Sequence, residues 1–184
     1  MKATGIVRRI DELGRVVVPK EIRRTLRLRE GDPLEIFTDR EGGVILKKYS
    51  PIRELTNFAN EYSESLEQII GNIILVCDRD NIISVSGVNK KEYLEKKISR
   101  DLEKVMDDRK SISFFQGVNK PVALYDEEEP DIKYTNQVVS PILAEGDVIG
   151  AVIIASKEQG KKFSEMEIKL AETAAVFLGK QIEC

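Results

Sequence analysis

Basic side chains gather in the first 29 residues of this chain. Nine lysines and arginines stand there against three acidic side chains, a net charge of +6, whereas the whole chain has a net charge of −3. Arginine outnumbers lysine in this stretch, and its planar fork of N–H donors suits phosphates and guanine edges. The pattern indicates double-stranded DNA as a partner. A small basic module that is merely well solvated is the plainer alternative.

The spacing of these side chains predicts which of them share a face. Arg8 and Arg9 are neighbours in a predicted strand, so they point to opposite sides. Arg23 and Arg27 are four residues apart in a predicted helix and share a face, and Arg24 lies about 100° further round. The basic cluster consists of Arg8, Arg9, Arg15, Lys20, Arg23, Arg24, Arg27 and Arg29.

The chain offers little for catalysis or for metal binding. It contains no histidine, which is the commonest general base and transition-metal ligand. Cys77 and Cys184 have no metal-ligand spacing, and Gly42-Gly43 lacks the pattern of a phosphate-binding loop. We therefore expect no enzyme activity, no catalytic residues, no metal and no cofactor. Two unpaired cysteines fit a reducing cytoplasm.

The basic cluster needs a small β-rich module to position it. We expect strands at 4–10, 15–18, 34–38 and 44–48, with turns at 11–14, 29–33 and 39–43. Pro19 suits the start of a short helix over about 20–26. A domain of about 50 residues, half of them in strands, buries too little apolar surface to be stable as a single copy. Pairing with a second copy is the expected remedy, and intertwined hairpins would also cover the strand edges.

A second domain of a different character follows. We place the first domain at 1–50, a linker that runs into a helix at 51–55, and the second domain at 56–184. Residues 51–184 carry 17 basic and 24 acidic side chains, so a basic first domain precedes an acidic second domain. Apolar residues at steps of three and four predict helices over 52–70, which Gly71 ends, over roughly 91–106, and from about 163 to 182.

Between these helices the apolar patterns predict one sheet. Expected strands are 73–77, 82–86, 137–144 and 148–155, with short strands or strand-like loops at 111–116 and 120–125. The run VIGAVIIA at 148–155 is the most apolar and should be central. An α+β fold follows, with helices flanking a sheet. No uninterrupted apolar stretch approaches the ~20 residues of a membrane span, so we expect no membrane association.

The first 50 residues resemble a known family. TGIVRRIDELGRVVVPKEIRRTLRLREGDPLEIFTDREGGVILKKY is similar to the AbrB-like, swapped-hairpin DNA-binding domain of bacterial transition-state regulators. The resemblance implies a β-barrel formed by an interlocked homodimer. It also implies DNA contacts at Arg8, Arg9, Arg15, Arg23 and Arg24. Lys2, Lys20 and Arg27 join this set on electrostatic grounds alone.

The later part resembles the GAF-type domain of sporulation regulators. ILVCDRDNIISVSG and SPILAEGDVIGAVIIAS carry this likeness. It implies a transcription regulator of spore-forming bacteria that activates and represses genes, assembled as a homotetramer through the second domain. By fold analogy an unknown small ligand could bind beside the sheet, and ordinary core packing is the alternative. The candidate lining is Cys77, Ser84, Ser86, Tyr93 and Ser140.

Two alternatives to a simple DNA-binding regulator remain, an antitoxin and a regulator whose DNA affinity depends on a small ligand. Swapped-hairpin domains also occur in antitoxins, which bind a toxin through a short C-terminal segment. The more than 130 residues of globular pattern after residue 50 argue against that reading. A ligand that tunes DNA affinity is the third hypothesis, and it requires two domain arrangements that the ligand distinguishes. For a DNA-binding regulator we expect a cytoplasmic, nucleoid-associated protein.

Overall fold

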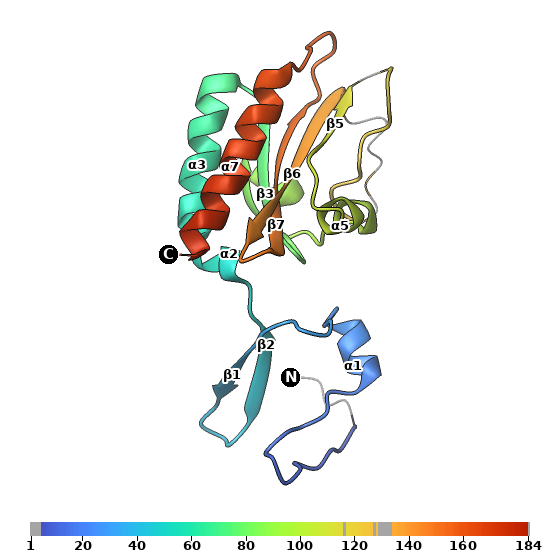
Figure 1. Cartoon of the computed structure of the whole chain (residues 1–184), viewed down its shortest axis with the longest axis vertical. Coiled ribbons are helices and arrows are strands. Elements are labelled where there is room, and N and C mark those ends of the chain that lie inside the picture. The colour runs from blue at the N-terminus through green and yellow to red at the C-terminus, as the bar shows by residue number, and fades with distance from the viewer. Residues whose placement is uncertain (1–4, 116, 127, 129–133, 184) are drawn as a thin grey trace. The chain divides into compact units, whose positions relative to one another are not determined.

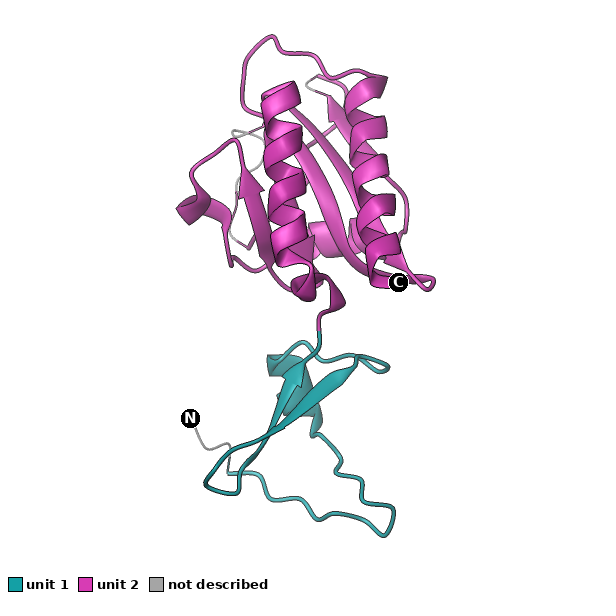
Figure 2. Cartoon of the chain, turned by 90° about the vertical axis from the view of Figure 1, so that its left-hand side faces the viewer, with its two compact units in different colours: residues 1–49 teal, residues 50–184 magenta. Residues whose placement is uncertain are grey.

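The computed structural model describes residues 5–115, 117–126, 128 and 134–183. The chain divides into two compact units, residues 1–49 and 50–184, which Figure 2 shows in different colours. The predicted linker at 51–55 coincides with a helical turn, α2 (Pro51–Glu54), which begins the second unit.

The N-terminal unit contains one short helix and one hairpin. Helix α1 is Lys20–Thr25, and the antiparallel strands β1 and β2 are Leu34–Thr38 and Val44–Lys48. The Asp39 carboxylate shapes the turn between the strands, because one oxygen accepts the N–H groups of Glu41 (2.9 Å) and Gly43 (2.6 Å). The predictions of this helix and of both strands are confirmed.

The two strands predicted before α1 are not formed within one chain. No ladder involves the described residues 5–19, where the backbone bonds to itself at the 11–15 turn: Asp11 N–H donates to Arg15, and Gly14 N–H donates to Asp11. A strand needs a neighbour to receive its N–H and C=O groups, and a single copy brings none to these segments. The prediction of strands at 4–10 and 15–18 is therefore wrong for the isolated chain.

The N-terminal unit has almost no interior of its own. Pro19 is the single buried residue among the described residues 5–49. Large apolar side chains stay open to solvent instead, with Val7 84% exposed and Leu13 74% exposed. Further exposed members are Ile6, Ile10, Val16, Val17, Leu26, Ile36, Phe37, Val44 and Leu46. A fold stabilised by burial cannot leave this much apolar surface uncovered.

The C-terminal unit is built on a five-stranded antiparallel sheet. Its strands are β3 (Ile73–Asp78), β4 (Ile82–Ser86), β5 (Ile112–Phe115), β6 (Asn136–Ala144) and β7 (Asp147–Ser156). They lie in the order β4-β3-β7-β6-β5. The prediction that the run at 148–155 is central is confirmed, because β7 has two strands on either side.

Helices cover both faces of this sheet. The long helices α3 (Thr56–Ile70) and α7 (Glu165–Glu183) lie side by side on one face, and α5 (Arg100–Asp107) lies on the other (Figure 1). One core cluster joins the sheet to α3 and α7, and a second joins it to Leu102 and Met106 of α5. None of the helices among the described residues combines the length and apolar character that a bilayer crossing requires.

The predicted helix over 91–106 is broken into two. Helix α4 is Lys90–Tyr93, and α5 begins at Arg100. Between them the chain runs along the edge of β4, where Glu95 N–H donates to Ile82 and Ile82 N–H donates to Lys96. These bonds to the sheet replace helical ones. The Ser99 hydroxyl then caps α5 by accepting the N–H of Leu102 at 3.0 Å. Residues 120–125 form a single bridge, Ile98 to Tyr125, and no strand.

Close packing between α7 and the sheet depends on Gly179. A Cβ at this position would lie 2.1 Å from the carbonyl oxygen of Leu143. Alanine in a helix is ordinarily favoured over glycine by about 1 kcal/mol, but a clash with backbone reverses the sign. We predict that Gly179→Ala lowers the free energy of unfolding by about 1–3 kcal/mol in urea denaturation. Thr173→Ala, on the exposed side of α7, is the control, and equal stability of the two variants would contradict this packing.

Candidate nucleic-acid interface

A tight turn organised by one carboxylate presents Arg15. Asp11 Oδ1 accepts the backbone N–H groups of Leu13 (3.0 Å) and Arg15 (2.8 Å), and Asp11 Oδ2 pairs with Arg15 Nε at 2.8 Å. Gly14 completes the turn with φ of 75°, a conformation that other residues adopt at a cost. The arginine side chain remains 70% exposed. The turn therefore holds a guanidinium at the surface in a defined place.

The same contacts shift the titration of the carboxyl group. The backbone N–H of Arg15, and then its guanidinium, hold the pKa of Asp11 below its ordinary value. Both donors favour the charged form of the carboxylate. Sequence reasoning missed Asp11 as a positioning residue, although an aspartate three residues before a glycine in a turn was a usable signal.

Helix α1 carries the second group of basic side chains. Lys20, Arg23 and Arg24 are exposed, and among the described residues none of them forms an ion pair with a carboxylate. The helix ends where Arg27 takes a left-handed conformation with φ of 51° and Leu28 N–H donates to the carbonyl of Arg23 at 2.7 Å. Arg27 is half-buried and so differs from the other three.

A half-buried ion pair links the end of α1 to the hairpin. Lys48 Nζ lies 3.3 Å from the Asp32 carboxylate and donates to the carbonyl of Arg27 at 3.3 Å. Both charged groups are mostly buried, at 18% and 14% exposure. Asp32 also accepts the N–H of Arg29 at 2.8 Å. Lys48 is therefore paired inside the unit, whereas Arg23 and Arg24 of α1 form no such ion pair among the described residues.

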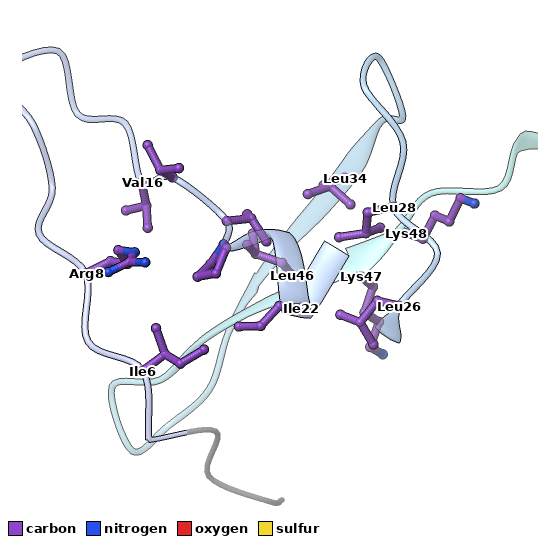
Figure 3. Close-up of a pocket in the computed structure, with 13 residues that line it drawn as sticks. Ile6, Arg8, Val16, Ile22, Leu26, Leu28, Leu34, Leu46, Lys47 and Lys48 are labelled. Carbon is purple, nitrogen blue, oxygen red and sulfur yellow. The ribbon is translucent and has the colours of Figure 1, made fainter. Parts of the chain in front are cut away.

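An apolar groove of about 540 Å³ runs beside this basic surface. Figure 3 shows Ile6 and Arg8 facing it from the first segment, with Ile22 of α1 and Leu46 of β2 opposite. Arg8 is part of its lining and Arg9 is not. The complete lining is Ile6, Arg8, Val16, Val17, Val18, Pro19, Ile22, Leu26, Leu28, Leu34, Leu46, Lys47 and Lys48.

The structure thus places the predicted DNA-contacting residues on three segments of one unit. Arg8 and Arg9 lie on the first segment, Arg15 on the turn, and Lys20, Arg23, Arg24 and Arg27 on α1 and its end. All of these except Arg27 are exposed. Lys2 lies outside the described residues. Their roles in DNA binding remain predictions.

The predicted ligand-lining residues are not brought together. Cys77 and Tyr93 belong to the core cluster on the α5 side of the sheet. Ser84 lies on the opposite side, where its hydroxyl donates to Ser63 Oγ at 3.1 Å and to the carbonyl of Ala59 at 3.3 Å in α3.

Ser86 and Ser140 lie on the same face of the sheet as Ser84, the face covered by α3 and α7. Ser86 pairs in register with Ile74, whose side chain belongs to the α3 and α7 cluster. Ser140 pairs with Val152 of the same cluster, and its hydroxyl lies 3.0 Å from that of Ser111. Because side chains alternate along a strand, one cavity cannot collect all five residues.

Carboxylates in the C-terminal unit have structural partners. Asp78 is buried and accepts Arg53 Nε at 2.7 Å and the backbone N–H groups of Asp80 (2.7 Å) and Asn81 (2.6 Å). Arg79 pairs with Asp107 at 2.8 Å. In the described part of the chain no three histidine, cysteine or carboxylate side chains gather into a metal site.

Comparison with known proteins decides the family. Residues 54–183 match the family described as "Stage V sporulation protein T C-terminal, transcription factor". Stage V sporulation protein T of Bacillus subtilis (strain 168) is 57% identical over 183 residues, which cover 100% of this chain and 99% of that protein. The chain belongs to the stage V sporulation protein T family.

Further similarities identify the two domains of this stage V sporulation protein T family member. Transition state regulatory protein AbrB of Bacillus subtilis is 65% identical over 51 residues, 28% of this chain and 52% of that protein. Residues 7–54 match the family described as "Antidote-toxin recognition MazE, bacterial antitoxin". The GAF domain of the Acinetobacter phosphoenolpyruvate-protein phosphotransferase aligns with a TM-score of 0.58 at 14% identity, over 72% of this chain and 87% of that one. The protein therefore joins an AbrB-like domain to a GAF-like α+β domain.

The Asp11–Arg15 turn yields a prediction on pH. Because the folded pKa of Asp11 is lowered, the carboxylate orders the turn above its ordinary pKa, and the order is lost as pH falls through the lower folded value. NMR titration of the Asp11 carboxyl carbon should show this pKa rising toward the ordinary value in Arg15→Ala. Arg9→Ala is the matched control. An unchanged pKa in Arg15→Ala would show that the guanidinium plays no part.

Proposed function

We propose that this protein is a sequence-selective, DNA-binding transcription regulator of sporulation-stage genes in a spore-forming bacterium, acting as activator and repressor. The observation that carries the proposal is the set of exposed basic side chains on α1, with Arg23 and Arg24 free of carboxylate partners among the described residues. Such groups neutralise phosphates at little desolvation cost. Family membership supports the same function, since the matched family is described as a transcription factor.

The DNA-binding form is a homodimer of the N-terminal domain. The apolar side chains that line the groove stay partly exposed in one copy, and two segments lack a strand partner. A second copy can meet both needs at once by placing its own segments along these edges and over the groove. The two sets of arginines would then share one surface and double the positive charge that faces DNA.

Salt dependence tests the DNA contacts. Each neutralised phosphate releases counterions, so affinity for promoter DNA should fall steeply as salt rises. Arg23→Ala and Arg24→Ala should each weaken binding about tenfold and flatten the slope, because a dimer loses two contacts per substitution. Fluorescence anisotropy over a salt series measures both effects.

Arg40→Ala is the matched control for these variants. Arg40 is an exposed arginine of the same domain, in the β1–β2 turn and outside the proposed surface. It should bind almost like the unaltered protein. Equal losses in Arg40→Ala and Arg23→Ala would mean that net charge alone, and no defined surface, governs binding.

The C-terminal domain supplies the second level of assembly, a homotetramer. Tyr62 of α3 stacks on Phe177 of α7 with ring centroids 5.3 Å apart, and the Phe58 ring is tilted against Phe177 at 5.9 Å. Phe58 is 44% exposed and the neighbouring Val176 is 58% exposed. An exposed aromatic and aliphatic patch on two adjacent helices suits association with a second copy. Joining two DNA-binding dimers raises avidity by effective concentration.

Native mass spectrometry of the full chain tests both levels of assembly. Leu46→Asp places a charge in the groove that the second copy should cover, and a buried unpaired charge costs several kcal/mol. We expect its mass to fall from four chains to two, with DNA binding lost. Arg40→Asp adds a charge at the exposed turn and should remain a tetramer. A tetramer in Leu46→Asp would contradict the proposed N-terminal dimer.

An antitoxin-like interaction module is the second candidate function. The match of residues 7–54 to an antitoxin family favours it. Recovery of a small toxin in fixed stoichiometry with the purified protein would support this function. Absence of a bound partner together with salt-sensitive DNA binding favours the regulator.

Three further expectations belong to the same proposal. We expect the protein to act without catalysis, since the matched family is described as a transcription factor. It resides in the cytoplasm, associated with the nucleoid, where promoter DNA is found. A small ligand of the GAF-like domain tunes its DNA affinity by favouring one arrangement of the assembly.

A further inference from the structure

In the C-terminal unit the Glu128 carboxylate lies between two hydrogen-bond donors, the Tyr134 hydroxyl and the backbone N–H of Leu124. These two donors are called the carboxylate seat. The Tyr134 hydroxyl donates to Glu128 Oε1 at 2.7 Å, and the backbone N–H of Leu124 donates to Oε2 at 2.6 Å. Tyr134 is 3% exposed and Leu124 is fully buried. Two donors that each hold one oxygen recognise the shape of a carboxylate as well as its charge.

A second tyrosine supports the first. The hydroxyl oxygens of Tyr93 and Tyr134 lie 3.1 Å apart, and Tyr93 is fully buried. The Tyr134 hydroxyl therefore lies within hydrogen-bond distance of both Tyr93 and Glu128. The buried contact with Tyr93 helps to hold the Tyr134 donor in place. Burial, and then the charge of Glu128, raise the pKa of Tyr134, so its hydroxyl keeps its proton.

The donors are fixed by parts of the fold other than Glu128. The segment that carries the Leu124 N–H is bonded to the chain ahead of α5: Ser99 N–H donates to the Leu124 carbonyl at 3.2 Å, and the Ser99 hydroxyl donates to Ala123. Ile98 forms a bridge with Tyr125. The Leu124 segment is therefore held in place by bonds that do not involve Glu128.

Positive charge flanks the seat. Lys96 Nζ lies 4.0 Å from the ring centre of Tyr125, and Lys157 Nζ lies 5.4 Å from that of Tyr93. Tyr93 and Tyr125 contact each other edge to face at 5.7 Å. Lys157 also pairs with Glu92 Oε1 at 3.5 Å, so Lys96 is the ammonium group that favours an anion beside this tyrosine cluster.

We propose that Tyr134 and Leu124 form a binding site for a small-molecule carboxylate, and that Glu128 is an internal occupant which this ligand displaces. Glu128 is half-buried, so its seat opens toward solvent. As a tethered group it competes at an effective concentration on the order of millimolar, which sets the ligand level needed to displace it. The site goes beyond DNA binding, and only its influence on DNA affinity rests on the proposed function.

The test vacates the seat in the full chain and offers acetate. Glu128→Ala should gain about 2–4 °C in melting temperature, saturably, with sodium acetate relative to sodium chloride at equal ionic strength. The unaltered protein should gain less, because Glu128 competes. Glu172→Ala, which removes an exposed glutamate of α7, is the matched control and should show no gain beyond that of the unaltered protein.

Adding Tyr134→Phe to Glu128→Ala should abolish most of this gain. Because the double variant could fail to fold, NMR supplies a second readout on Glu128→Ala alone, where ¹³C-carboxyl acetate should shift saturably and show cross-relaxation with the Tyr134 ring. A response that does not saturate, a gain equal to that of Glu172→Ala, or acetate without contact to Tyr134 would each overturn the site. DNA binding measured on the same variants would remain intact, so this failure is distinct from failure of the proposed function.

Discussion

Apolar surface that one copy cannot bury is the constraint on which the N-terminal domain depends. A chain of this length, with one six-residue helix and one hairpin, has too few elements to enclose an interior, and Pro19 alone is buried among its described residues. In the proposed dimer, association and folding are the same event for this domain. Helix α1 leaves Lys20, Arg23 and Arg24 exposed to solvent.

The C-terminal domain solves the opposite problem. Its sheet is covered by helices on both faces, so strands β3 and β7 are apolar almost throughout and side chains alternate between two separate cores. Polar groups within such a sheet must be satisfied locally, as Ser84 is by Ser63 of α3. Charged groups lie at the ends of the strands, where Asp78 at the end of β3 accepts the backbone N–H groups of Asp80 and Asn81.

Local patterning predicted those parts of the fold whose structure is decided locally. Strands 34–38, 44–48 and 82–86 and the stop at Gly71 follow from turn chemistry and apolar periodicity. The break in the predicted helix over 91–106 could not be predicted, because Glu95 and Lys96 form backbone hydrogen bonds with Ile82 of β4 in place of helical ones. A local apolar pattern does not show such a contact with the sheet. The predicted ligand-lining residues do not share one face, because Cys77 of β3 and Ser84 of β4 point to opposite sides of the sheet. The exposure of the basic residues could be predicted from the sequence, because charged side chains are mostly exposed in folded proteins.

Under the proposed function, in which Arg15 contacts a phosphate, the pairing of Arg15 with Asp11 would make DNA association a proton-linked reaction. A phosphate that draws the guanidinium away would take a donor from the carboxylate and leave it next to the polyanion, so the pKa of Asp11 would rise. Complex formation would then take up protons in acidic solution. Arg15 would also contribute less to cation release than the arginines of α1, because the ion pair it gives up had already neutralised its charge.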